Sequence, residues 1–261
     1  MAYSPYVLPE IYEVAFSFRD YGLAVDFLQE AARKAGLRHV RSMVELGCGP
    51  GQYCREFARR RVKSYGVDLS PEMVAYTRRK CAEEKLDCTT LEEDFRQFKL
   101  PHPVDLAVCM MATFGYLLSN DDILAHFDSV ADNLVDQGIY IAELPHPRDV
   151  FDSSPDERNF IWDIEKDGLK VHTEWGIDRT FDPITEVDSE TVKMTYEKDG
   201  RTETVAGPDH IRNVGYGLIR ALIRLSNRFE IAAAYGDINV NQPFDNSKKA
   251  WRMILVLRKI T

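Results

Sequence analysis

The sequence lacks most of the features that mark membrane, secreted and metal-binding proteins. It has no run of about 18 uncharged apolar residues, so we expect no membrane-spanning helix. Its first ten residues carry neither a basic stretch nor an apolar core, so we expect no secretion. The five cysteines form no Cys-x-x-Cys pair, which argues against structural zinc and against a disulfide framework. These absences predict a cytoplasmic protein without a metal site.

Positive charge is also in short supply. The chain has 33 Lys and Arg against 42 Asp and Glu, which gives a formal net charge of −9. Because an acidic surface repels phosphate backbones, we do not expect nucleic acid as a partner. The 261 residues are 44% apolar and 29% charged, which is ordinary for a globular chain that buries a core without staples.

The first part of the chain alternates between strand-like and helix-like segments. Short apolar runs predict strands over residues 42–47, 63–69, 88–94, 104–110 and 139–144. Helical spacing of apolar residues, with caps at Ser70 and Ser119, predicts helices over residues 22–35, 52–61, 71–86 and 120–137. Such an alternation is typical of a parallel sheet covered by helices on both faces.

The pattern changes after Pro147. Residues 155–212 have no helical period, and they contain strand-like runs over 170–181, 184–197 and 201–206 with an Asp-Gly turn at 199–200. Residues 216–227 are again helical, and strands follow over 229–235 and 251–259, separated by about 15 residues, so this last pair is expected to be antiparallel. We therefore predict an α/β, doubly wound, mostly parallel seven-stranded sheet with an inserted antiparallel sheet.

A glycine-rich turn, Glu45-Leu-Gly-Cys-Gly-Pro-Gly51, joins the first strand to the next helix. Glycines there allow a tight turn and the close approach of a ligand. Asp68 ends the next strand, 21 residues after Gly47, where a carboxylate can accept hydrogen bonds from ribose hydroxyls. The two features predict a site for a ribose-bearing cofactor.

The details of the turn distinguish two cofactor classes. A dinucleotide fingerprint would require glycine or alanine where the chain has Gln52, and it disfavours an acid at Glu45. Gly-x-Gly-x-Gly preceded by Glu instead resembles motif I of class I S-adenosylmethionine (SAM)-dependent methyltransferases. Asp68 matches that family's acidic residue after the second strand, and Glu93-Asp94-Phe95 resembles its adenine-binding segment. The resemblance covers residues 40–147, and the last two strands fit the family's closing hairpin.

The resemblance implies that SAM is the cofactor and S-adenosylhomocysteine the product. Family members that act on small molecules fold the segment before the first helix over the cofactor. Here Arg19 would pair with the methionyl carboxylate, and Tyr12 or Phe16 would shield the sulfonium. The other positions that the resemblance assigns to cofactor binding are Glu45, Gly47, Cys48, Gly49, Gly51, Asp68, Leu69, Met73, Asp94, Phe95 and Met110.

Methyl transfer requires alignment of the reacting atoms and exclusion of water, and a base only where a proton must leave. The candidates for that base are Tyr116, after the fourth strand, and Glu143 and His146, after the fifth. The segment after the fourth strand lacks the Asn/Asp-Pro-Pro-Tyr/Phe motif of enzymes that methylate amines of DNA bases. Cys109 follows Val108 rather than Pro, which disfavours a cytosine C5 nucleophile.

The resemblance predicts methyl transfer to a nitrogen or oxygen of a small molecule, with nitrogen favoured by the resemblance of the insert to a substrate lid and by the available carboxylates. The alternatives are a catalytically inactive SAM-binding regulatory or partner-binding module and a nicotinamide-dependent oxidoreductase. His172, Trp175, Arg179, His210 and Arg212 are candidates to line a substrate lid. We expect four parts: a cofactor-covering segment (1–36), a SAM-binding core (37–152), an antiparallel insert that acts as lid or homodimer surface (153–212), and a C-terminal helix with closing strands (213–261).

Overall fold

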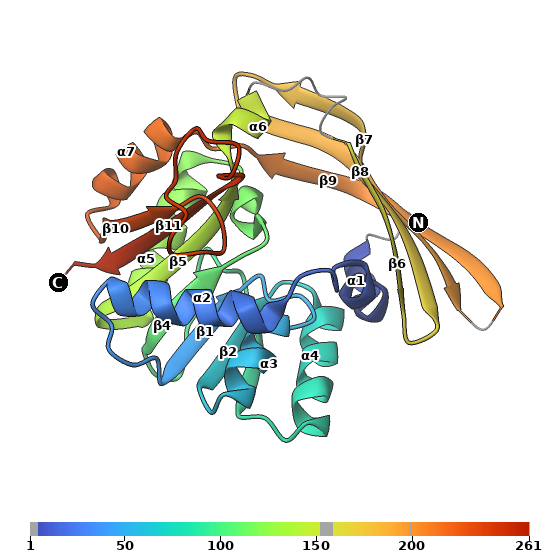
Figure 1. Ribbon diagram of the computed structural model, residues 1–261, viewed down its shortest axis with the longest axis horizontal. Coiled ribbons are helices and arrows are strands. Elements are labelled where there is room, and N and C mark those ends of the chain that lie inside the picture. The colour runs from blue at the N-terminus through green and yellow to red at the C-terminus, as the bar shows by residue number, and fades with distance from the viewer. Residues whose placement is uncertain (1–4, 152–158, 199, 261) are drawn as a thin grey trace.

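The computed structural model describes residues 5–151, 159–198 and 200–260, and it contains two sheets (Figure 1). The strands of the larger sheet are β1 (Ser42–Leu46), β2 (Lys63–Asp68), β3 (Cys88–Glu92), β4 (Val104–Cys109), β5 (Leu134–Pro145), β10 (Phe229–Tyr235) and β11 (Arg252–Lys259). Their order is β10-β11-β5-β4-β1-β2-β3, and β11 runs antiparallel to both of its neighbours. The predicted fold class is confirmed.

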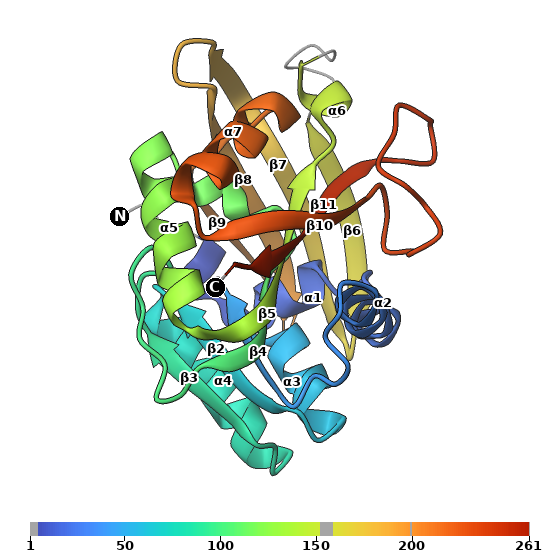
Figure 2. The same cartoon turned by 90° about the vertical axis from the view of Figure 1, so that its left-hand side faces the viewer.

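Helices cover both faces of this sheet (Figure 2). The longer helices are α2 (Tyr21–Lys34), α3 (Gln52–Arg59), α4 (Pro71–Glu83), α5 (Asn120–Asp132) and α7 (Tyr216–Ser226). Successive strand residues point to opposite faces, so Met43 packs in a core with α2 and α3, and Val44 packs in a core with α5 and α7. The described helices include none that is long and apolar enough to cross a membrane.

Local sequence signals account for where several of these helices begin. Ser70 caps α4 by accepting a hydrogen bond from the backbone N–H of Met73. Ser119 and Asp122 form a reciprocal capping box at the start of α5. The end of α5 differs from the prediction, because the helix stops at Asp132 and β5 already begins at Leu134, before Gly138.

The insert forms a second, antiparallel sheet of β6 (Phe160–Lys166), β7 (Leu169–Asp182), β8 (Val187–Lys198) and β9 (Arg201–Arg212), in that order. Strand β6 was not predicted from the sequence. The prediction also ended β9 too early, at residue 206, although Pro208 is tolerated because β9 is an edge strand. The predicted domain boundary at residues 152–153 and Asp199 of the predicted turn lie outside the described residues.

Helix α1 (Pro9–Ala15) lies between the two sheets. The other short helical segments are η1 (Pro5–Val7), η2 (Thr113–Tyr116) and α6 (Pro147–Phe151). Ile11 and Val14 of α1 pack against Val171 and Met194 on the inner face of the insert. Figure 1 shows the insert arching away from the main sheet with α1 beneath it. This third apolar cluster attaches the insert to the N-terminal segment.

Candidate functional site

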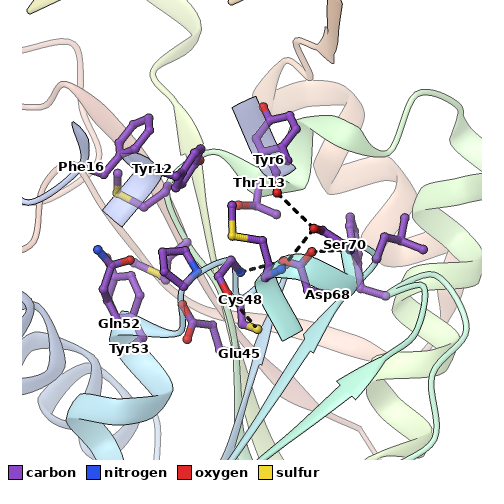
Figure 3. A pocket seen from close by; sticks show the side chains of 18 of the residues that line it. Tyr6, Tyr12, Phe16, Glu45, Cys48, Gln52, Tyr53, Asp68, Ser70 and Thr113 are labelled. Carbon is purple, nitrogen blue, oxygen red and sulfur yellow. Dashed lines mark hydrogen bonds between the residues drawn. The ribbon is translucent and has the colours of Figure 1, made fainter. Parts of the chain in front are cut away.

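A cavity of about 400 Å³ opens at the carboxyl ends of β1, β2 and β4 (Figure 3). It lies where the strand order reverses, between β1 and β4, which is where open α/β sheets bind their ligands. The volume falls within the range of small-molecule sites, about 300–1,000 Å³. The wall comes from the glycine turn and the ends of β2 and β4, and the roof comes from the N-terminal segment.

The three glycines of the turn have different reasons to be glycine. Gly47, Gly49 and Gly51 have φ angles of 64°, 51° and 75°, a left-handed conformation that disfavours other residues. A Cβ at Gly47 would lie 2.3 Å from Cγ2 of Thr113, and one at Gly51 would lie 2.3 Å from Cγ2 of Thr77. A Cβ at Gly49, which lines the cavity, would meet nothing within 4 Å. Gly49 therefore leaves open space at the turn.

Asp68 lies directly against this turn. Its Oδ2 accepts a hydrogen bond from the backbone N–H of Gly49 at 2.7 Å, and its Oδ1 accepts one from Ser70 at 2.9 Å. Burial raises the pKa of Asp68, and the backbone donors oppose that rise. A carboxylate has about four lone-pair sites, so each oxygen can still accept a hydroxyl hydrogen from a ligand in the cavity.

Glu45 reaches the cavity from inside the sheet. Its carboxylate accepts a hydrogen bond from the backbone N–H of Cys54 at 2.8 Å, in the first turn of α3. Burial raises the pKa of Glu45 to about 8, against the effect of that hydrogen bond. Glu45 thus fixes the start of α3 behind the glycine turn.

The remaining walls are largely apolar. Leu69, Met73 and Phe95 line the cavity together with Cys48 and Met110. Rings from the N-terminal segment form the roof: the ring centroids of Tyr6 and Tyr12 are 5.6 Å apart, and those of Tyr12 and Phe16 are 4.5 Å apart. The N-terminal segment therefore covers the cavity with aromatic faces.

Arg19 lies outside the cavity lining and is paired within the protein. Its guanidinium donates to both carboxylate oxygens of Glu143, at 2.9 and 3.1 Å. Glu143 also accepts from the backbone N–H of Met111 at 2.9 Å and lies 3.2 Å from Nε of Arg252. Burial alone would raise the pKa of Glu143, but the two arginines and the hydrogen bonds hold it below its usual value. These contacts make Glu143 a buried counter-ion.

Other candidates also lie away from the cavity. His146 lies close to the backbone carbonyl of Asp245 and accepts from the N–H of Arg148, so both ring nitrogens are engaged. Asp94 pairs with Arg96 at 2.5 Å, which holds the pKa of Asp94 down against the effect of burial. The described residues include no group of three or more His, Cys, Asp or Glu arranged to hold a metal ion.

Tyr116 lines the cavity and leads to a residue that the sequence analysis missed. Its hydroxyl donates to Oδ2 of Asp209, on β9, at 3.3 Å, and it is also hydrogen-bonded to the hydroxyl of Tyr6. Asp209 is 5% exposed, and burial raises its pKa to about 6. Side chains alternate between the two faces of a strand, so the spacing of Val205, Gly207 and Asp209 in the sequence could have placed Asp209 on the inward face of β9.

The sequence matches known methyltransferases over part of its length. Residues 43–138 match a family described as "Methyltransferase domain". One relative is a dTDP-3-amino-3,4,6-trideoxy-alpha-D-glucopyranose N,N-dimethyltransferase of Streptomyces venezuelae, 27% identical over 127 residues, or 47% of this chain and 52% of that protein. Another is a trans-aconitate 2-methyltransferase of Mycobacterium tuberculosis, 36% identical over 100 residues, or 38% of this chain and 36% of that protein. The chain thus spans about half the length of the first curated relatives it matches.

The fold matches solved structures over nearly the whole chain. A SAM-dependent methyltransferase from Clostridium acetobutylicum aligns with a TM-score of 0.78 and 17% identity, over 94% of each chain. DesVI of Streptomyces venezuelae aligns with a TM-score of 0.75 and 18% identity, over 95% of this chain and 96% of that one. Neither alternative function is favoured by these similarities. The matches support the predicted resemblance to class I SAM-dependent methyltransferases, a family whose cofactor is SAM.

Proposed function

We propose that this chain transfers the methyl group of SAM to an amine nitrogen of a small molecule, and that amino sugars are the acceptor class to test first. The observation that carries the proposal is the cavity at the strand-order reversal, where Asp68 lies against an open glycine turn. The named activity of the Streptomyces venezuelae relative, an amino-sugar N,N-dimethyltransferase, supports the choice of acceptor.

The residues around the cavity fit the cofactor. Asp68 would accept hydrogen bonds from the ribose hydroxyls, beside the open space at Gly49. Leu69, Met73 and Phe95 would pack against the adenine ring from the apolar side of the cavity. When bound there, SAM supplies a methyl group that its sulfonium already activates.

The protein's main contribution is then to orient and enclose. Tyr12 and Phe16 place electron-rich ring faces over the cavity, which suits a positive sulfonium. Met110 and Met111 add an apolar wall that helps to exclude water from the reacting atoms. Glu143 and His146 are held by other groups of the protein, so Tyr116 is the predicted base that lies on the cavity wall.

The proposal also includes a cytoplasmic location, no action on nucleic acid and a homodimer. The five cysteines are free thiols, in line with a cytoplasmic protein. The net charge of −9 supports an enzyme that does not act on nucleic acid. Exposed Phe160 and Ile161 on the edge strand β6 support the insert as a homodimer surface, which light scattering of the purified protein would test.

Calorimetric titration with SAM and S-adenosylhomocysteine tests the cofactor site. The wild type should bind both ligands. Asp68→Asn should weaken both affinities by about 10–150-fold, since the amide group removes one charged hydrogen bond worth about 1.5–3 kcal/mol. A protein that binds neither ligand, or an Asp68→Asn variant that binds as tightly as the wild type, would refute the assignment.

Asp105 offers a matched control. Asp105 is a buried aspartate that, like Asp68, accepts two backbone N–H hydrogen bonds, here from Arg41 and Ser42, but it lies at the amino end of β4. Asp105→Asn should lower the free energy of unfolding and leave both affinities unchanged. A loss of affinity in both variants would mean that binding reports general destabilisation.

A further inference from the structure

A chain of hydroxyl groups connects the cavity to a buried carboxylate of the insert. Tyr6 and Tyr116 both line the cavity, and their hydroxyls are hydrogen-bonded to each other. The Tyr116 hydroxyl donates onward to Oδ2 of Asp209 at 3.3 Å. A hydrogen bond from η2 therefore connects the insert to the cavity wall.

The inner face of the insert carries an excess of buried negative charge around Asp209. Glu190 is the direct cross-strand partner of Asp209, and both side chains are buried. Arg179 contacts Glu190 at 2.5 Å and Asp188 at 3.5 Å, so these two carboxylates share one guanidinium, and neither salt bridge includes Asp209. Neither carboxylate oxygen of Glu190 accepts a hydrogen bond of normal geometry from the described residues. Such surroundings favour a positively charged ligand and disfavour an anionic one.

We propose that the acceptor enters as a protonated amine and that Asp209 takes its proton through the hydroxyl of Tyr116. This inference rests on the proposed function and adds to it the charge of the acceptor and a base on β9. Tyr116 is the residue that touches the amine, and Asp209 acts through it.

The step balances with the groups at hand. The ammonium donates a proton to the Tyr116 oxygen while the Tyr116 proton moves to Oδ2 of Asp209. The freed lone pair of the amine then forms the new N–C bond as the S–C bond breaks, and that bond's electron pair stays on sulfur, which becomes a neutral thioether. Without this proton transfer the nitrogen has no lone pair to attack with.

The surroundings of Asp209 suit it to the task near neutral pH. Burial raises the pKa of Asp209 to about 6, while the Tyr116 hydrogen bond and the nearby His210 oppose that rise. Burial also keeps the pKa of Tyr116 well above its usual value, so Tyr116 stays a hydroxyl and relays the proton. The titratable and charged groups that act on Asp209 or face its neighbours are Tyr6 from η1, Tyr12 from α1, Tyr116 from η2, Arg179 from β7, Asp188 and Glu190 from β8, and His210 from β9.

The test compares Asp209→Asn and Tyr116→Phe with a matched control on the same strand. Glu203 also lies on β9 and accepts a tyrosine hydroxyl, that of Tyr196 at 2.5 Å, but the pair is exposed. The acceptor probes are dTDP-3-amino-3,4,6-trideoxy-α-D-glucopyranose, whose sugar amine is protonated although its diphosphate is anionic, and trans-aconitate, which has only carboxylates and no amine. Binding of S-adenosylhomocysteine is measured by calorimetry for every variant.

At pH 7 we expect Asp209→Asn and Tyr116→Phe to lower kcat for the amine by about 10²–10⁴-fold, the usual contribution of a positioned base. Their affinity for S-adenosylhomocysteine should not change. The wild-type rate should fall below pH 6 as Asp209 becomes protonated, whereas the Asp209→Asn rate should follow the amine's own deprotonation at higher pH. Glu203→Gln should behave as the wild type, and trans-aconitate should not be methylated.

A second readout needs no acceptor. The carboxyl carbon of Asp209, assigned in ¹³C spectra by its loss in Asp209→Asn, should titrate near pH 6, and Tyr116→Phe should raise the midpoint. A midpoint that Tyr116→Phe does not move would overturn the link between the two residues.

Three further outcomes would overturn the inference. These are a wild-type kcat and pH profile in Asp209→Asn, equal methylation of trans-aconitate, and a wild type that binds S-adenosylhomocysteine but methylates no amine. The last outcome leaves the cofactor assignment in place and indicates a binding module. Failure to bind S-adenosylhomocysteine at all would instead refute the proposed function.

Discussion

Replacing Glu143 by glutamine should destabilise the fold more than most single substitutions, because it removes the charge that balances two arginines. The side chain of Glu143 is 0% exposed and that of Arg19 is 6% exposed. Removing one partner of a buried ion pair typically costs about 3–5 kcal/mol, since a desolvated charge remains. The glutamine amide would also present a donor where Oε2 now accepts from the N–H of Met111. We therefore expect a loss of about 3–5 kcal/mol, or about 6–20 °C in Tm for a chain of this size.

Urea unfolding followed by circular dichroism measures this loss. Arg19→Met in the Glu143→Gln background should recover part of the stability, because it removes one of the unbalanced charges. Glu30→Gln breaks an exposed pair with Arg33 and should cost at most about 0.5 kcal/mol. A loss below about 1 kcal/mol for Glu143→Gln at an unchanged m value would contradict the account. So would a double variant that is no more stable than Glu143→Gln alone.

Two further predictions concern the glycine turn. Between pH 4.5 and about 8 the folded protein keeps a proton on Glu45 that the unfolded chain releases, so the free energy of unfolding of the ligand-free protein should fall as pH rises through this range. Glu45→Gln should flatten that dependence in urea midpoints at pH 6 and pH 8, and parallel profiles would argue against it. Gly47→Ala adds a clash with Thr113 to left-handed strain, whereas Gly49→Ala adds strain alone of about 1–2 kcal/mol. Gly47→Ala should therefore have the lower Tm of the two by differential scanning calorimetry, and equal values would show that Thr113 yields freely.

The sequence predicts those parts of the site whose residues lie close together in the chain. The glycine turn and the Ser70 cap use residues a few positions apart, so their spacing carries the information. Asp68 reaches the turn because it ends β2, the parallel neighbour of β1, which strand order alone predicts.

Contacts between distant segments could not be predicted in this way. Arg19 and Glu143 are 124 positions apart, and Tyr116 and Asp209 are 93 positions apart, so only the packing of the N-terminal segment and the insert brings them together. A charged residue in isolation gives no sign of which partner will neutralise it. Arg19 was therefore assigned to the cofactor carboxylate, a role that stays a prediction.

The proposed lid residues show what strand parity adds. The five residues were predicted as one group, although they lie on both faces of the sheet. Trp175 faces inward and packs against Phe16 with ring centroids 5.7 Å apart, and Arg179 is also buried. His172 pairs with Asp163 on the exposed face. Alternation within each strand separates the two sets once the buried face is known, but bulges in β7 obscure it in the sequence.

Helix α1 joins the roof of the cavity to the insert. The indole N–H of Trp162 donates to the carbonyl of Ala15 at 2.8 Å, and Phe16 packs against the same tryptophan. The aromatic rings of the roof and the strands of the insert are therefore packed together. A motion of the roof that releases S-adenosylhomocysteine should therefore also move the insert and open the site of the amine acceptor. Release of S-adenosylhomocysteine should then slow when an acceptor is present, which stopped-flow measurements would reveal.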